Sequence, residues 1–323
     1  MNPPAALVDQ VLAGQRLALA RLITLLENED PAGRAALDRL FAHTGRAHII
    51  GVTGSPGAGK SSLVNQLARS FRHPAAEVQP LTVAIIAVDP TSPFTGGALL
   101  GDRVRMRDLA GDAGVFIRSM ASRGALGGLA RATAAAAQAL DAAGFDVILI
   151  ETVGAGQAEV DIARLAHTTL VVEAPGMGDD IQAIKAGILE IADILVVNKA
   201  DRPGAENTLR ALRGMLENGR NSAGGWQTRL VATVATEQRG IAELRAAIDA
   251  HTAHLRAGSA WAERDQARLQ AELEALVQRE LVARWRAGLS PADYQQTLKR
   301  LAARELSPYQ ALEQLLAQAE RGG

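Results

Sequence analysis

Cysteine is absent from this sequence of 323 residues, so disulfide bonds and thiolate metal sites are both excluded. Aromatic residues make up only 3% of the chain, which leaves few side chains on which bases could stack. The net charge is −1, from 34 basic and 35 acidic residues, so no long-range field attracts a nucleic-acid backbone. These absences argue against nucleic acid as a partner.

Long apolar runs are also missing. The longest, such as residues 147–150, have the length of a strand and fall short of the roughly 18 residues that indicate a membrane helix. The amino-terminal stretch MNPPAALVDQ lacks the basic segment and apolar run of a signal peptide. Hydrophobic residues nevertheless make up 48% of the chain, enough for a core. We therefore expect a soluble protein of the cytoplasm, with no membrane partner.

Hydrophobic periodicity divides the chain into three predicted regions. Residues 1–46 form an N-terminal helical extension, with two helices between 5 and 46. Residues 47–257 alternate β-branched runs with helical stretches, which is typical of an α/β fold with a mostly parallel sheet flanked by helices. Residues 258–323 form a C-terminal helical extension, with helices at 261–286, 291–304 and 308–320. The predicted strands are 48–53, 81–88, 115–118, 147–151, 168–173, 194–198 and 230–234.

A glycine-rich segment directly follows the first predicted strand and has the spacing of a P-loop. Its backbone N–H groups are expected to surround the β-phosphate of a nucleotide. Lys60 would reach the β- and γ-phosphate oxygens, and the Ser61 hydroxyl would ligate Mg²⁺. The alternative is a chance glycine-rich turn, which a full match directly after a strand disfavours. The predicted phosphate-binding residues are Gly54, Ser55, Pro56, Gly57, Ala58, Gly59, Lys60, Ser61 and Ser62.

The sequence NKAD at 198–201, after a predicted strand, points to guanine as the base. Asp201 can accept hydrogen bonds from the ring N–H and the amine of guanine, whereas adenine offers no matching pair of donors. Lys199 would pack over the base and Asn198 would brace the loop. Ala235 lies where GTPases use a backbone N–H to recognise the guanine O6 atom. A four-residue motif also occurs as an ordinary polar turn, but its place after the P-loop and an acidic strand end favours GTP and GDP.

Acidic residues at other strand ends form a predicted Mg²⁺ site with Ser61. Glu151 takes the place of the acid in the DxxG motif of GTPases, and Gly154 would sense the γ-phosphate. Asp89 and Asp102 are further candidates for the metal site, with ordinary caps or turns as the alternative.

The residue directly after Gly154, where Ras-like GTPases place a water-orienting glutamine, is Ala155. Gln157, two residues further on, is a candidate for that catalytic role, and an ordinary polar loop residue is the alternative. We therefore expect slow intrinsic hydrolysis that a partner accelerates.

A second glycine-rich loop, at 176–185, leads into a predicted helix. It is either a plain connection with acids near a helix N-terminus or a switch loop that contacts a partner. Its candidate residues are Asp179, Asp180, Gln182 and Lys185.

The order of these motifs resembles the MeaB/ArgK/MMAA-type GTPases of the SIMIBI class, over nearly the whole chain. The resemblance is carried by GSPGAGKSSL at 54–63, AVDPTSPFTGGALLGDRVRM at 87–106, FIRSMASRGALGGLA at 116–130, ETVGAGQAEVDIA at 151–163, GMGDDIQAIKAGILEIAD at 176–193 and NKAD at 198–201. The sequence departs from the commoner family wording at Val104 and at Glu173-Ala174-Pro175, among other places. We interpret these departures as changes near partner-facing loops, outside the nucleotide chemistry.

This resemblance implies a chaperone for a coenzyme-B12-dependent acyl-CoA mutase. Such proteins use GTP to gate the delivery of adenosylcobalamin and the ejection of damaged cofactor, and they are typically homodimers with contacts through the C-terminal extension. By resemblance, Asp89, Asp102 and Glu151 correspond to the Mg²⁺-associated acids of the family. The loop from Asp179 to Lys185 corresponds to a switch that communicates with the mutase.

Two other functions fit the sequence less well. A metal-insertion GTPase of the SIMIBI class would use a segment rich in histidine or cysteine, but this chain has no cysteine and six scattered histidines. A kinase or transport ATPase would use ATP, which the NKAD motif disfavours.

The base assignment gives the first prediction. Asp201→Asn should shift the preference from GTP towards xanthosine triphosphate, because the pattern of hydrogen-bond donors and acceptors facing the base changes. Competition binding with the two nucleotides measures this shift. Unchanged GTP affinity in the variant would count against the assignment.

Overall fold

The structure is a computed structural model of the protein. The structure describes residues 3–74, 78–90, 107–109, 111–122, 128–152, 162–176, 190–218 and 225–322. The chain divides into two units, Met1–Asp265 and Gln266–Gly323, with the boundary inside a long helix. The three-region division made from the sequence stays a prediction.

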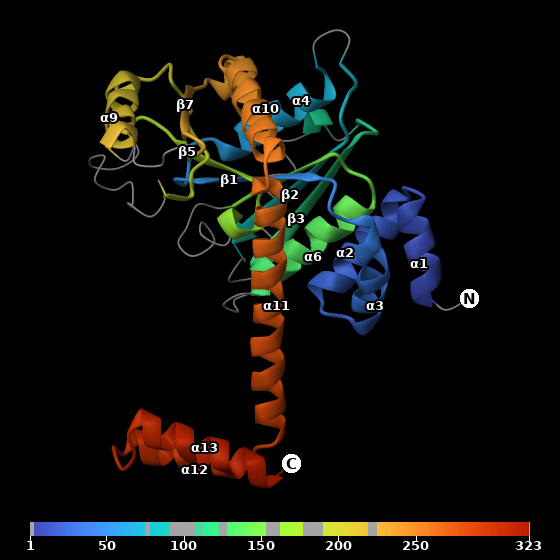
Figure 1. The fold of residues 1–323 in the computed structure, drawn as a ribbon, viewed down its shortest axis with the longest axis vertical. Coiled ribbons are helices and arrows are strands. Elements are labelled where there is room, and N and C mark those ends of the chain that lie inside the picture. The colour runs from blue at the N-terminus through green and yellow to red at the C-terminus, as the bar shows by residue number, and fades with distance from the viewer. Residues whose placement is uncertain are drawn as a thin grey trace. The chain divides into compact units, whose positions relative to one another are not determined.

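A seven-stranded sheet with the order β3-β2-β4-β1-β5-β6-β7 forms the centre of the first unit (Figure 1). All its strand pairs are parallel, and helices flank it, so the predicted fold class is confirmed. Each predicted strand is present, and the largest shift is at β3, which continues past its predicted end. The strands are β1 (His48–Gly54), β2 (Val83–Pro90), β3 (Val115–Ser122), β4 (Val147–Glu151), β5 (Thr168–Glu173), β6 (Ile194–Val197) and β7 (Arg229–Ala232).

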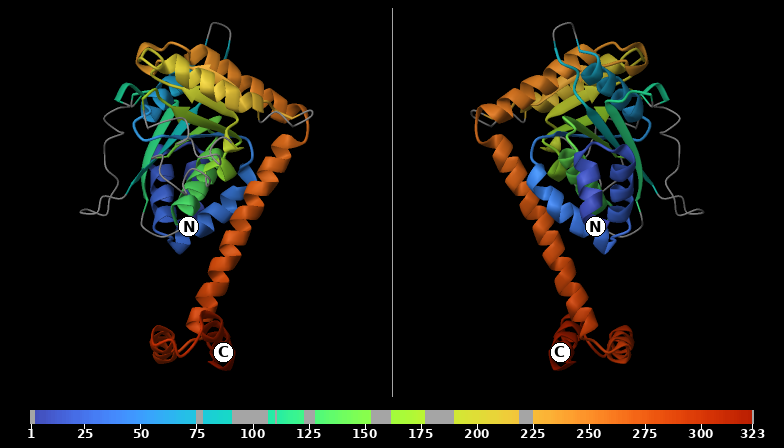
Figure 2. Two further views of the ribbon diagram at one scale, coloured as in Figure 1. Left: turned by 90° about the vertical axis from the view of Figure 1, so that its left-hand side faces the viewer. Right: turned by 90° about the vertical axis from the view of Figure 1, so that its right-hand side faces the viewer.

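Helices cover both faces of the sheet, which is why β1, β4, β5 and β6 are buried along their whole length. One hydrophobic cluster joins one face of the sheet to α6 and the N-terminal helices, and a second joins the other face to α4 and α10. The layers can be followed in Figures 1 and 2. These helices are α1 (Pro3–Leu12), α2 (Arg16–Glu27), α3 (Pro31–Leu40), α4 (Lys60–Arg72), α6 (Gly128–Ala142), α9 (Ala205–Asn218) and α10 (Ile241–Ala257).

The N-terminal region contains three helices, so the prediction of two was wrong. Gly14, at φ 74°, lies between α1 and α2 and reverses the chain where apolar periodicity alone predicts one helix. The third helix begins as the sequence predicts, because the Asp30 carboxylate caps it by accepting the Ala32 N–H at 2.8 Å. An ion pair between Glu27 and Arg118 attaches these helices to β3.

The second unit contains the greater part of α11 (Ala260–Ala287), followed by α12 (Pro291–Ala302) and α13 (Pro308–Gly322). Short turns connect the three helices. Ser290 caps α12 by accepting the Ala292 N–H at 3.2 Å. Apolar side chains on α11 recur every three or four residues, yet they are exposed. This apolar stripe consists of Leu269, Leu273, Leu276, Val277 and Leu281.

A buried chain of polar contacts lies at the amino ends of β1, β5 and β6. The Thr168 Oγ1 atom lies 2.7 Å from His48 Nε2 and 2.9 Å from His251 Nδ1. His251 Nε2 in turn lies 3.3 Å from Asp193 Oδ1. Arg264, near the start of α11, donates to both carboxylate oxygens of Asp193, at 2.7 and 2.9 Å. The contacts therefore join the sheet to α10 and to the first residues of α11.

His167 adds a second attachment at the same edge. Its Nδ1 atom accepts the Ile49 N–H at 3.0 Å, which assigns the ring proton to Nε2, 3.1 Å from the Asp265 carboxylate. The ring also stacks on Trp261, with centroids 4.0 Å apart and planes 11° from parallel. The start of α11 is thus fixed by stacking as well as by hydrogen bonds.

Burial changes the titration of two groups in this cluster. Loss of hydration, reinforced by the nearby cations and by His167 and His251, lowers the pKa of His48 from 6.5 to about 3. Burial alone would raise the pKa of Asp193, but hydrogen bonds from Arg264 and His251 outweigh it and lower that pKa to about 2. His48 is therefore neutral and Asp193 ionised over the physiological range.

The His48 pKa predicts an acid-dependent loss of stability. Because the folded pKa lies below the unfolded value, stability is full above pH 6.5 and falls as the pH is lowered towards 3. The contribution of His48 is at most about 1.4 kcal/mol of unfolding free energy per pH unit. Urea unfolding of a His48→Gln variant between pH 6.5 and 4 should therefore show a shallower pH dependence. His73→Gln, at an exposed position, is the matched control and should keep the wild-type slope; equal slopes in all three proteins would contradict the prediction.

Candidate functional site

The phosphate loop connects β1 to α4 at the carboxyl edge of the sheet. Gly54 has φ 123°, and a side chain there would collide with the Val172 carbonyl of the neighbouring strand. Gly59 has φ 90°, and its missing side chain leaves room for the Asn198 amide. Both glycines are therefore required by the close approach of backbone to neighbouring groups. The loop and the first turn of α4 have the strand–loop–helix arrangement that the sequence predicts for a phosphate site.

Lys60 and Ser61, the first two residues of α4, are both buried. The Lys60 ammonium donates to the carbonyls of Gly54 and Ser55, at 2.8 and 3.0 Å, so it lies over the phosphate loop. The Ser61 hydroxyl donates to Glu151 Oε1 at 2.6 Å. The structure thus brings together one predicted metal ligand from α4 and one from the end of β4.

These two oxygens suit Mg²⁺, which prefers hard oxygen ligands and keeps several waters or phosphate oxygens in its shell. Among the described residues no group of three or more His, Asp or Glu side chains could hold a metal ion by itself. A metal at Ser61 and Glu151 would therefore share its coordination with the nucleotide. The backbone of Asp89 lies at the end of β2, paired with Ala121 of β3, and Asp102 lies outside the described residues.

Asn198 connects the phosphate loop to both base-recognition segments. Its side-chain amide donates to the Ala58 carbonyl at 2.9 Å, and its Oδ1 atom accepts from Thr233 Oγ1 and from the Ala235 N–H, both at 3.1 Å. Asn198 is 2% exposed, so these bonds are shielded from water. Lys199, at φ 57°, extends over the loop and donates to the Gly57 carbonyl at 2.7 Å.

The two base-contact candidates take different positions. Asp201 is exposed just beyond the end of β6, whereas Ala235 is buried and begins a short 3₁₀ helix. The Ala235 N–H, expected to meet guanine O6, points to Asn198 Oδ1 in this structure. The remaining predicted residues, Gly154, Gln157, Asp179, Asp180, Gln182 and Lys185, lie outside the described residues.

Glu173, the last residue of β5, was not among the predicted nucleotide-site residues, yet it contacts the phosphate loop. Its carboxylate accepts a hydrogen bond from the Ser55 hydroxyl at 2.6 Å, and its backbone carbonyl accepts the Asn198 N–H at 2.8 Å. The signal that could have found it is an acidic residue at the end of a strand paired with β1. The sequence alone predicts that this segment lies near partner-facing loops.

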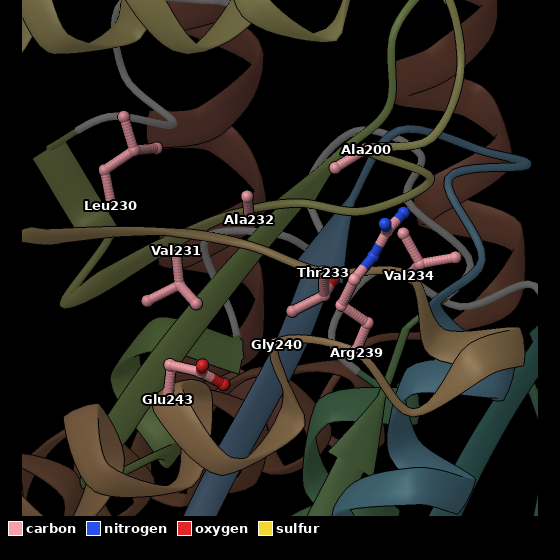
Figure 3. Close-up of a pocket in the computed structure, with 9 residues that line it drawn as sticks. All are labelled: Ala200, Leu230, Val231, Ala232, Thr233, Val234, Arg239, Gly240 and Glu243. Atoms are coloured by element: carbon pink, nitrogen blue, oxygen red, sulfur yellow. The ribbon is translucent and has the colours of Figure 1, made fainter.

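A cavity of about 430 Å³ lies beside the base-recognition residues (Figure 3). In the view of Figure 3, Leu230, Val231 and Glu243 lie to one side and Ala200, Val234 and Arg239 to the other. Ala200 belongs to the NKAD motif and Val234 precedes Ala235, so the cavity adjoins the segments that the sequence predicts to recognise the base. Its walls are Ala200, Leu230, Val231, Ala232, Thr233, Val234, Arg239, Gly240 and Glu243.

In the described part of the chain, no helix combines the length and apolarity that crossing a membrane requires.

Comparisons with known proteins find similar GTPases and a similar solved structure. The family model described as "Methylmalonyl Co-A mutase-associated GTPase MeaB" matches residues 19–290. A protein of Pyrococcus abyssi, named for an inferred GTPase activity, is 44% identical over 319 residues, which cover 98% of this chain and 97% of the relative. The GTPase ArgK of Escherichia coli K12 is 39% identical over 255 residues, or 76% of this chain and 75% of ArgK. The crystal structure of a LAO/AO transport system kinase has a TM-score of 0.73 at 30% identity, covering 97% of this chain and 96% of that one.

The position of Asn198 predicts a defined loss of nucleotide affinity. Asn198→Ala would leave buried groups without partners and free the phosphate loop from the segment after β7, at a cost of about 1–3 kcal/mol. GTP and GDP should both bind roughly ten- to a hundredfold more weakly. Titration with fluorescent nucleotides measures both constants, and Asn207→Ala, on the exposed face of α9, is the control. Wild-type affinity in Asn198→Ala would show that these bonds do not organise the site.

Proposed function

Since the chain belongs to the MeaB family of methylmalonyl-CoA mutase-associated GTPases, we propose that it hydrolyses GTP to control a coenzyme-B12-dependent acyl-CoA mutase. The observation that carries this proposal is the extent of the family match, from residue 19 to residue 290. That range includes most of α2, all of α3 and the full length of α11, which nucleotide binding alone does not require. In this function GTP binding and hydrolysis gate adenosylcobalamin loading and the protection or reactivation of the mutase, and the cobalamin stays with the partner.

The site residues have separate roles in this reaction. The phosphate loop and Lys60 bind and orient the β- and γ-phosphates, while Asp201 and Lys199 select guanine. The Ala235 N–H donates to Asn198 Oδ1, so Ala235 helps to hold the site together and is not proposed to contact the base. Ser61 and Glu151 would hold Mg²⁺, together with Asp89 and Asp102. When bound, the metal neutralises charge on the phosphate oxygens.

Partner control of this reaction acts through residues outside the phosphate loop. Gln157 orients the attacking water, because Ala155 offers no polar atom for that role. Gly154 senses the γ-phosphate, and the loop with Asp179, Asp180, Gln182 and Lys185 couples this event to the mutase. Hydrolysis is slow until the partner orders these groups.

The proposal includes a homodimer in the cytoplasm. The apolar stripe of α11 is exposed within its own unit: Leu273 and Leu281 are each 60% exposed. A helix stripe of this kind is stabilised when a matching helix covers it, and a second copy of the chain supplies one. Light scattering tests this directly, because a monomeric mass at micromolar concentration would contradict the dimer.

GTP turnover, measured without and with the cobalamin-dependent mutase encoded nearest to this protein, tests the proposed function. We expect a slow basal rate that rises many-fold with the mutase. Lys60→Ala should abolish nucleotide binding. Lys185→Ala should keep its GTP affinity and lose the stimulation, whereas Lys299→Ala, at an exposed position on α12, should keep both.

The outcomes separate the activity from the partner. Turnover that ignores the mutase would leave the GTPase activity in place and reject this partner. Normal stimulation of Lys185→Ala would show that its loop is not the coupling element.

A further inference from the structure

Glu173 places a buried carboxylate directly against the phosphate loop. It is 7% exposed, and its Oε2 atom lies 2.6 Å from the Ser55 hydroxyl that donates to it. Ser55 is the second residue of the loop, and its carbonyl accepts a hydrogen bond from Lys60 at 3.0 Å. A single residue of the loop therefore links the Glu173 carboxylate to the lysine that reaches the nucleotide phosphates.

The backbone fixes the position of Glu173 beside the loop. Strands β1 and β5 are paired so that Gly54 lies opposite Val172, which places Ser55 and Glu173 next along each strand. On its other side Glu173 pairs with Val197, and its carbonyl accepts the Asn198 N–H at 2.8 Å. Glu173 is thus fixed between the phosphate loop and the base-recognition loop.

A negative charge at this point opposes the binding of other negative charges. The loop backbone and Lys60 bind the β- and γ-phosphates, and repulsion between like charges is strong where burial reduces solvent screening. GTP carries one phosphate more than GDP, and that phosphate occupies the γ position. The repulsion therefore acts more on GTP than on GDP.

We propose that Glu173 is a specificity-determining residue of the nucleotide site: through Ser55 it positions the phosphate loop, and its charge lowers the affinity for GTP relative to GDP. The inference rests on the GTPase activity and not on the identity of the partner, because every measurement uses this protein alone. Glu173 thereby sets the relative affinity for GTP and GDP that the protein has before a partner binds.

Two variants separate the charge of Glu173 from its hydrogen bond. Glu173→Gln removes the charge and keeps an oxygen that accepts from Ser55, whereas Glu173→Met removes both at similar volume. The dissociation constants of GDP and of a slowly hydrolysed GTP analogue are measured with Mg²⁺. Both variants should raise the ratio of GTP to GDP affinity about tenfold. Only Glu173→Met should weaken both nucleotides together, because Ser55 is then no longer held.

Asp141→Asn is the matched control. Asp141 is also buried, at 3% exposure, but its carboxylate accepts the N–H groups of residues 45–47, just before β1 begins. The control should unfold at a lower temperature than the wild type and keep the wild-type affinity ratio.

If Glu173→Gln and Glu173→Met both keep that ratio within twofold, the proposal is wrong. If Glu173→Gln does not fold, Glu173→Met decides the question alone.

Discussion

Strand β1 is hydrogen-bonded on both sides, to β4 and β5, and the whole candidate site depends on this pairing. Because the strands are parallel, their carboxyl ends meet at one edge of the sheet. The register then places the residues: Glu151 pairs with Val52, two positions before the phosphate loop begins. Backbone geometry, rather than attraction between side chains, brings Glu151 within reach of Ser61.

Close packing at that edge leaves little freedom for the loops. Asn198 fills the space beside Gly59 and binds the phosphate loop through Ala58 and the segment after β7 through Ala235. A displacement of the phosphate loop, of the loop with Asn198 or of the segment after β7 therefore changes the contacts of the other two. Glu173 belongs to the same packed region, since its carbonyl holds the Asn198 backbone and its carboxylate holds Ser55. The predicted phosphate-binding and base-recognition segments are therefore joined to each other within this chain.

The same strands carry a second polar cluster at their amino ends, with apolar residues between. His48 begins β1, Thr168 begins β5, and Asp193 directly precedes β6. Their contacts fix α10 and the start of α11 through His251 and Arg264. A charged group is stable there because Asp193 is paired with Arg264, while His48, which is buried and has Arg245 and Arg256 nearby, stays neutral. The central strands β1, β5 and β6 thus connect the two ends of the sheet. Their amino ends hold the start of α11, and their carboxyl ends carry the candidate nucleotide site.

The sequence by itself determined the strands, the fold class, the P-loop and the NKAD motif, because each depends on local periodicity or on residues that are adjacent in the chain. It did not predict three N-terminal helices, because the apolar spacing continues across Gly14 although the helical backbone conformation ends there. Nor did it predict the bond between Ser55 and Glu173 or the cluster from His48 to Arg264. Those contacts join residues far apart in the chain, and only the strand order and register bring them to hydrogen-bonding distance.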